Sequence, residues 1–375
     1  MNRRRSRIRA RAVRPVPVAA IVVVVGLLVG VGFSQGWWLG PRAPANLPGG
    51  RTGTGVGDDA VDTAVRAVLD QDATVITSST RPRTAQQRGE VYQWTTRTFE
   101  IKARGRVSVL VRRLNQRVIP VGGRVLSQTP TAIQVGIRRA GLEAVTDEIR
   151  LIPFTPAARV AILFDDAGGS LVHAQAIIDL GRAVTITVLP GLRFSREVAL
   201  KAEEEGLEVM LHLPLEPEDP KLLLGPGGIT TAMNDTQIAQ TVAADLDQVP
   251  GAIGINNHEG SKATADERVM RAVLEVIKSR GLFFVDSVTS PRTIAGRLAA
   301  QMQIPTASRA VFLDNQNQAE PIRAQLRELI AVALQRKQAI AIGHAMRMTP
   351  QVLQELLGEF DRQDIELVPV STLVH

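Results

Sequence analysis

The sequence predicts an α/β protein: a distorted seven- or eight-stranded (β/α) barrel preceded by a transmembrane helix and a small α+β domain. From residue 159 onward, apolar runs alternate with helical patterns, which is typical of βα units. Several of those runs end in an acid or a histidine, and an uncharged apolar run near the N-terminus predicts the transmembrane helix. The expected parts are a basic cytoplasmic tail at 1–15, an anchor at 16–39, a flexible linker at 40–57, a small α+β domain at 58–153 and the barrel at 154–375.

The composition excludes several classes of protein. None of the 375 residues is a cysteine, which excludes disulfides, thiolate catalysis and zinc sites with cysteine ligands. The net charge is +7, but seven arginines lie within the first 14 residues, and from residue 151 onward 20 Lys and Arg stand against 27 Asp and Glu. A region this acidic repels the phosphate backbone of a nucleic acid. We therefore expect no nucleic-acid partner.

The N-terminal segment predicts export. Residues 16–39 contain no charge, and this run is long enough to cross a bilayer, which takes roughly 20 apolar residues. Trp37 and Trp38 stand where interfacial aromatics belong, and the arginine-rich side is expected to stay in the cytoplasm. A cleavable signal peptide is the alternative, but no clear A-x-A site follows. We expect a single-pass anchor that lies, in a Gram-negative host, in the inner membrane, with the C-terminal domain in the periplasm.

The region between the anchor and the barrel predicts a spacer and a small domain. Residues 40–57 are rich in Gly, Pro, Ala and Thr, and their G-x-G-x-G pattern follows no strand, so it does not indicate a nucleotide loop. A helical pattern at 58–70 is followed by strand-like or apolar segments at 91–102, 107–118, 123–127, 132–137 and 144–152. No catalytic constellation occurs here, so a spacer or binding module is expected.

The barrel is predicted from eight apolar runs, of which the last is the weakest. The first run, from Arg159, leads into Asp165-Asp166-Ala167-Gly168-Gly169. The others are expected at 183–190, 208–212, 254–261, 282–287, 310–315, 339–344 and 367–370, and helices at 195–205 and 234–248.

Polar residues stand at the ends of six of these runs. They are Asp165 and Asp166, His212, the Asn256-Asn257-His258 cluster, Asp286, Asp314 and His344. If the strands are parallel, these groups meet at one face of the sheet, where α/β enzymes place their chemistry. Adjacent carboxylates repel each other, and a cation is the simplest compensation, although a single such residue is more often a packing or capping residue. His173 and His375 are expected to be unrelated to the site.

Six of these segments together resemble the polysaccharide deacetylase (NodB-type) superfamily, and more closely its divergent, YibQ-like branch of bacterial envelope proteins. The matching segments are ILFDDAG at 162–168, LHLPLEP at 211–217, GINNHEGS at 254–261, FFVDS at 283–287, VFLDN at 311–315 and AIGH at 341–344. The resemblance covers residues 159–375. It implies a distorted (β/α) barrel that removes N- or O-acetyl groups from carbohydrate with one divalent metal ion, usually zinc.

The resemblance also implies roles for individual residues. Asp165 would be the general base, Asp166 and His212 metal ligands, and His344 the general acid. The family's second metal histidine would fall at 216, where this chain has Glu216. We expect the third ligand to be His258, with Glu216 as the second choice. The family's Arg-x-Pro-x-Gly segment is also missing, and the Asn256-Asn257-His258 cluster stands in its neighbourhood.

These roles are chemically coherent. A metal held by two imidazoles and one carboxylate keeps a position open for water and lowers the pKa of that water. A base can then take the proton, and a histidine whose pKa is raised by Asp314 or Asp286 can protonate the leaving group. The first hypothesis is thus a membrane-anchored, metal-dependent deacetylase of acetylated polysaccharide or peptidoglycan. The second is a non-catalytic relative that binds glycan or a protein partner.

Overall fold

A computed structural model describes residues 54–55, 58–105, 107–139, 141–153 and 155–375. The predicted cytoplasmic tail and anchor, and all of the linker except 54–55, lie outside these residues. No helix within the described ranges is long and apolar enough to cross a membrane. Two sheets organise these ranges, one in residues 54–151 and one in residues 158–367.

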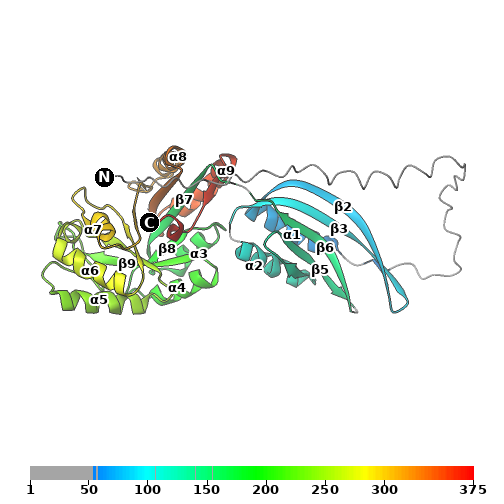
Figure 1. Ribbon diagram of the computed structural model, residues 1–375, viewed down its shortest axis with the longest axis horizontal. Helices are drawn as coiled ribbons and strands as arrows, with labels where there is room; N and C mark the ends of the chain where they lie inside the picture. The colour runs from blue at the N-terminus through cyan, green and yellow to red at the C-terminus, as the bar shows by residue number, and fades with distance from the viewer. Residues whose placement is uncertain (1–53, 56–57, 106, 140, 154) are drawn as a thin grey trace, which may run out of the picture. The chain divides into compact units, whose positions relative to one another are not determined.

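The first sheet has the strand order β1-β3-β6-β5-β4, with β2 paired to β3. Its strands are β1 Thr54–Gly55, β2 Ala73–Gln87, β3 Glu90–Ala103, β4 Arg124–Gln128, β5 Ala132–Arg139 and β6 Leu142–Leu151. Helices α1 (Asp59–Asp72) and α2 (Val107–Val118) lie on the same face of this sheet (Figure 1). Their apolar residues, such as Val65 and Leu114, pack on Phe99 and Ile101 in a fully buried core.

Strand β2 was not predicted from the sequence. Its residues 74–84 are exposed, so apolar and polar side chains do not alternate along it as they do in a half-buried strand. Strand β2 is held in the sheet by antiparallel pairing with β3, in a register that runs from Ala73↔Ala103 to Gln87↔Glu90. The segment 107–118, which has an apolar pattern, forms the helix α2.

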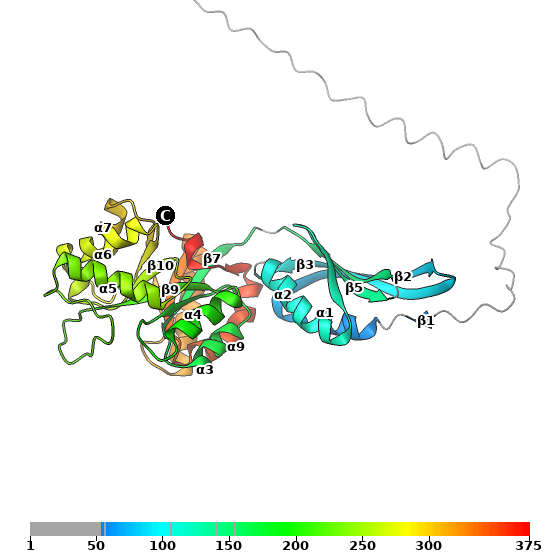
Figure 2. The same cartoon turned by 90° about the horizontal axis from the view of Figure 1, so that it is seen from below.

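The second sheet has the order β12-β11-β10-β9-β8-β7-β14-β13, with β15 paired to β7, and all its strand pairs are parallel. Its strands are β7 Ala158–Ala167, β8 Thr185–Val188, β9 Glu208–Leu215, β10 Gly254–Glu259, β11 Phe283–Asp286, β12 Thr306–Ser308, β13 Val311–Phe312, β14 Gln338–His344 and β15 Ile365–Leu367. The helices are α3 Leu171–Ile178, α4 Ser195–Glu204, α5 Asp235–Gln248, α6 Glu267–Ser279, α7 Ala295–Gln301, α8 Ala319–Arg336 and α9 Thr349–Arg362. They lie along the outside of the curved sheet (Figures 1 and 2).

The sheet is a half-barrel, and the prediction of a barrel of seven or eight strands was wrong in two respects. The described strands number nine, because the short strand β12 was missed, and the two ends of the order, β12 and β13, do not pair with each other in the described chain. These strands are three and two residues long. The terminal residue His375 instead exchanges two backbone hydrogen bonds with Thr306 of β12.

Each central strand has an outward and an inward face because successive side chains point to opposite sides. On β7, Val160, Ile162 and Phe164 pack outward in the large core beneath the helices. Ala161 and Leu163 point inward, into a smaller core that they share with residues of β9, β11, β14 and the C-terminal segment. This alternation decides which strand-end residues reach the inside of the half-barrel.

Candidate metal centre

The inward face of the half-barrel changes from apolar to polar at the carboxyl ends of its strands. Asp165 follows Leu163 by two positions on β7, His212 follows Met210 on β9, and His344 follows Ile342 on β14. The strand alternation therefore directs all three toward the interior. Asp165 is the register partner of His344, and His212 is the register partner of Asn256 on β10.

Asp166 reaches the same interior through an unusual backbone conformation. Simple alternation would turn it outward, away from Asp165. Its φ is +61°, and the register of β7 against β8 shifts between Phe164 and Ala167. Such a bulge re-aims a side chain, and a left-handed conformation costs a non-glycine residue roughly 1–2 kcal/mol. The local strain thus coincides with a residue for which the sequence predicts chemistry.

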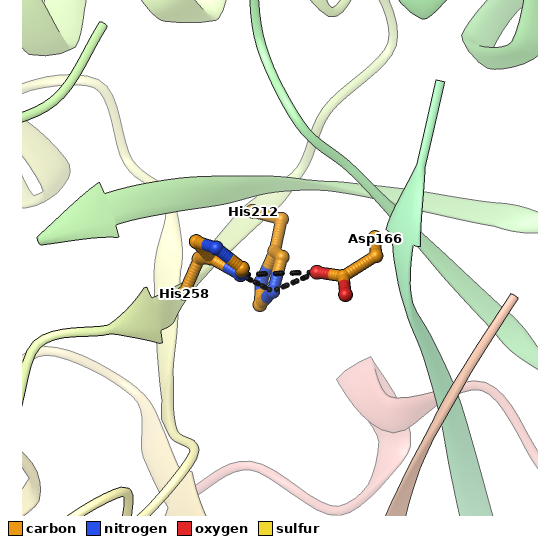
Figure 3. Close-up of side chains that lie close together, drawn as sticks. All are labelled: Asp166, His212 and His258. Carbon is orange, nitrogen blue, oxygen red and sulfur yellow. Dashed lines mark hydrogen bonds and ion pairs between the residues drawn. The ribbon is translucent and has the colours of Figure 1, made fainter. Parts of the chain in front are cut away.

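Three side-chain atoms converge at this point, as Figure 3 shows. Asp166 Oδ1 lies 3.3 Å from His212 Nε2 and 3.0 Å from His258 Nδ1, and the two ring nitrogens are 3.1 Å apart. Ligands about 2.0–2.1 Å from a tetrahedral zinc ion lie about 3.3 Å from one another, so these atoms fit one ion. Asp166 Oδ1 is moreover buried without a hydrogen-bond partner. The donor set of two imidazoles and one carboxylate therefore fits a divalent metal.

The electrostatics of these three residues favour a positive charge between them. Burial disfavours the carboxylate of Asp166, but its close contacts with His212 and His258 and their charges outweigh burial and hold its pKa well below the usual range. Burial likewise disfavours the imidazolium of His212, yet the charge of Asp165 and contact with Asp166 raise its pKa. The field that attracts a proton to this point also attracts a metal cation.

Asp165 lies beside the three ligand atoms without joining them. Its Oδ2 is 3.5 Å from His212 Nε2. Thr187 donates a hydrogen bond of 2.6 Å to Oδ1, and the amide of Asn256 donates to Oδ1 and Oδ2 at 3.0 and 3.1 Å. These donors compensate the buried charge of a carboxylate that is 3% exposed. Both oxygens of Asp165 are thus hydrogen-bonded, and the carboxylate lies beside the three converging atoms.

His344 faces Asp166 from the other side and is held by Asp314. His344 Nε2 lies 3.9 Å from Asp166 Oδ2, and its Nδ1 lies 2.8 Å from Asp314 Oδ1. The backbone N–H of His344 and the hydroxyl of Thr349 both donate to Asp314 Oδ2, at 2.7 and 2.5 Å. Burial opposes the charged ring, but the bond and charge of Asp314 prevail and raise the pKa of His344 to about 9.

Two further acids from the sequence analysis have other partners. Glu216 accepts hydrogen bonds from the backbone and hydroxyl of Thr231 and from Lys262 Nζ, and it is not among the three converging residues. Asp286 accepts from Thr293, Val288 N and Gly296 N, so it fixes the loop after β11 and the start of α7. The partner of His344 is therefore Asp314.

Asn256 and Thr187 contact the predicted base, and no role was predicted for either of them from the sequence. A signal for Asn256 was present, since it precedes His258 by two positions on one strand and so shares its face. Thr187 lies within an apolar strand and gave no such signal. His173, on α3, and His375, beside Thr306 and Gln338, are not among the residues of the centre.

Comparisons with known proteins find similarity in the region of the half-barrel. A family model of divergent polysaccharide deacetylases matches residues 162–374. An uncharacterised protein of Haemophilus influenzae strain Rd is 32% identical over 216 residues, 58% of this chain and 76% of the relative. YibQ of Escherichia coli K12, also described as uncharacterised, is 34% identical over 219 residues, 58% of this chain and 68% of the relative.

A solved structure extends the likeness to the fold. The crystal structure of ATU2773, an uncharacterised protein of Agrobacterium tumefaciens C58, is 25% identical in sequence, with a TM-score of 0.56. The match covers 59% of this chain and 92% of that one. The region that the family model matches, residues 162–374, contains most of this half-barrel of parallel strands. Because the family match spans more than half of its length, the chain belongs to the divergent polysaccharide deacetylase family.

Proposed function

We propose that the protein is a metal-dependent hydrolase that removes acetyl groups from an acetylated envelope polysaccharide or from peptidoglycan. The observation that carries the proposal is the position of Asp165 and His344 around the converging atoms of Asp166, His212 and His258. A carboxylate and a protonated imidazole on either side of one metal centre are the base and the acid that hydrolysis of an amide or ester requires. Zinc is the ion we propose, because two imidazoles and one carboxylate are a typical zinc donor set.

Each residue of the site has its own role in the proposed reaction. A bound divalent ion would lower the pKa of a water molecule and stabilise negative charge on the acetyl oxygen. Asp165, held in place by hydrogen bonds from Thr187 and Asn256, accepts the proton of the attacking water. His344, protonated at neutral pH because its pKa is about 9, donates a proton to the leaving amine or alkoxide. Asp314 keeps the ring of His344 in place and charged.

The proposal is tested on the purified full-length chain. We expect one zinc ion per chain after incubation with zinc and dialysis, and its loss in Asp166→Ala and His212→Ala. His375→Ala is the control, because His375 bonds Gln338 and is outside the metal centre. Acetate release from acetylated chito-oligosaccharides and peptidoglycan fragments is then measured with and without zinc. Zinc binding without acetate from any of these glycans would overturn the catalytic proposal in favour of a non-catalytic glycan- or protein-binding role.

We also propose that the chain is anchored in the inner membrane through residues 16–39 and that residues 58–375 work in the periplasm. Support comes from the uncharged run and the seven arginines that precede it. Alkaline phosphatase fused after residue 57 is expected to be active, and green fluorescent protein at the same place is expected to be dark. The reverse result would place the domain in the cytoplasm.

A further inference from the structure

Asn256 occupies a fully buried position between two residues with different proposed roles. Its side chain contacts the predicted base Asp165 on one side and the predicted ligand His212 on the other. We propose that Asn256 is a positioning residue that fixes both: it selects the nitrogen that His212 offers to a metal, and it holds Asp165 where a base must stand. This inference rests on the proposed metal-dependent hydrolase.

Hydrogen-bond chemistry allows one orientation of the Asn256 amide. An ionised carboxylate can only accept, so the nitrogen that lies 3.0 and 3.1 Å from Asp165 Oδ1 and Oδ2 must be the amide NH₂. The same NH₂ lies 3.2 Å from Ser287 Oγ. The amide oxygen is then the atom that faces His212, 3.0 Å from Nδ1. The contact with Asp165 thereby determines the contact with His212.

The amide oxygen in turn determines the tautomer of His212. An amide oxygen can only accept, so Nδ1 of His212 must carry the proton that it donates. When the ring is neutral, its free lone pair is then on Nε2, the atom 3.3 Å from Asp166 Oδ1. A hydrogen bond of this kind at the far nitrogen of a ligating histidine orients the ring and raises its basicity. His212 is thus prepared to bind a cation through Nε2.

The amide nitrogen of Asn256 acts on Asp165 in a different way. Asp165 and Asp166 are adjacent in sequence and both contact His212, so their charges repel at short range. Neutral donors from Asn256 and Thr187 stabilise the charge of Asp165 without adding a cation that would compete with a metal ion. They also fix the direction of the carboxylate, because Asn256 bonds to both of its oxygens.

Two substitutions separate these functions. Asn256→Leu keeps the shape and removes both bonds, so we expect zinc affinity to fall about 10–100-fold, the usual cost of losing such a partner. Asn256→Asp keeps an acceptor for His212 but sets a carboxylate against Asp165. We expect its zinc affinity to stay within about threefold of wild type, while the displaced base lowers kcat about 100-fold.

Asn257 is the matched control. It is the next residue on β10, is 1% exposed, and bonds Ser287 N and the Glu259 carbonyl instead of Asp165 and His212. We expect Asn257→Leu to lower the unfolding temperature and to leave zinc affinity, measured by chelator competition, within about threefold of wild type. If Asn257→Leu and Asn256→Leu lose zinc affinity equally, the loss reflects lower stability of the fold and not a specific role of Asn256. That result would overturn the inference.

Nitrogen NMR gives a readout that does not depend on enzymatic activity. The chain has five histidines, so labelling of histidine nitrogens gives a spectrum that can be assigned by substitution. In the zinc-loaded wild type we expect His212 to bind through Nε2 and to show a Nδ1 proton protected from exchange. An Nε2 proton on His212, or unchanged zinc affinity in Asn256→Leu, overturns this inference alone. Absence of zinc from the wild type overturns the proposed function as well.

Discussion

His344 and Asp314 form a two-point contact at the mouth of the half-barrel. Asp314 accepts the ring Nδ1–H of His344 at one oxygen, 2.8 Å away, and the backbone N–H of the same residue at the other, 2.7 Å away. Both the position and the charge of the ring thus depend on one carboxylate.

The first prediction concerns the alkaline limit of activity. With a pKa of about 9, His344 stays protonated through neutral pH and loses its proton near pH 9. Asp314→Asn removes the charge that raises this pKa, so the alkaline limit is expected to move down by about 1–2 pH units and kcat at neutral pH to fall. Rates of acetate release between pH 5 and 10 measure the shift. If the alkaline limit does not move, a group other than His344 sets it.

The second prediction concerns stability. The pKa of His344 is raised on folding, so the stability that its protonation contributes is fully present below its unfolded pKa of 6.5 and is lost as pH rises through about 9. His344→Gln should remove this dependence. The difference in unfolding free energy between wild type and variant is expected to shrink by about 1–3 kcal/mol between pH 6 and pH 9.5. Urea unfolding of the metal-free protein at both pH values measures it, and a constant difference contradicts it.

The third prediction distinguishes the two choices for the third ligand. His258→Ala removes an atom 3.0 Å from Asp166 Oδ1, so zinc affinity should fall at least about 100-fold and the rise in unfolding temperature on adding zinc should disappear. Glu216→Gln should leave both unchanged, because Glu216 bonds Thr231 and Lys262. Zinc titrations of the two variants measure both affinities. If Glu216→Gln loses zinc affinity and His258→Ala keeps it, Glu216 is the third ligand.

The fourth prediction separates the base from the ligands. Asp165→Asn keeps the shape of the side chain, and Asp165 is not one of the three converging residues. We expect zinc to bind within about tenfold of the wild-type affinity, while kcat falls about 100–10,000-fold through loss of the base. Zinc content and acetate release are measured on the same sample. Loss of the metal in this variant would make Asp165 a ligand and leave the base unassigned.

The sequence predicted the strands of the half-barrel and the histidines at their ends because both are local patterns. An apolar run followed by His212 or His344 is visible in one short stretch, and parallel pairing brings such ends together. The orientation of Asp166 could not be predicted in this way, since it depends on a positive φ and a register shift against β8. Nor could the half-barrel be told from a closed one, because closure depends on the pairing of edge strands.

The partners of the predicted residues were harder to foresee than the residues themselves. Asp314 and Asp286 both end an apolar run, and the sequence could not say which one holds His344. The structure shows Asp314 there because β13 pairs with β14, the strand of His344, whereas β11 lies on the far side of the sheet beyond β10. The order of the strands in the sheet, which is a long-range property, therefore determines which of the two acids contacts His344.

The spacing of the converging residues also bears on when the metal would enter. Asp166, His212 and His258 come from β7, β9 and β10, and 46 residues separate the two histidines. No helix or hairpin could bring any two of them together early, as happens in a zinc finger, where the ion drives folding. The sheet must assemble first. We therefore expect the chain to fold without the ion and to bind it last.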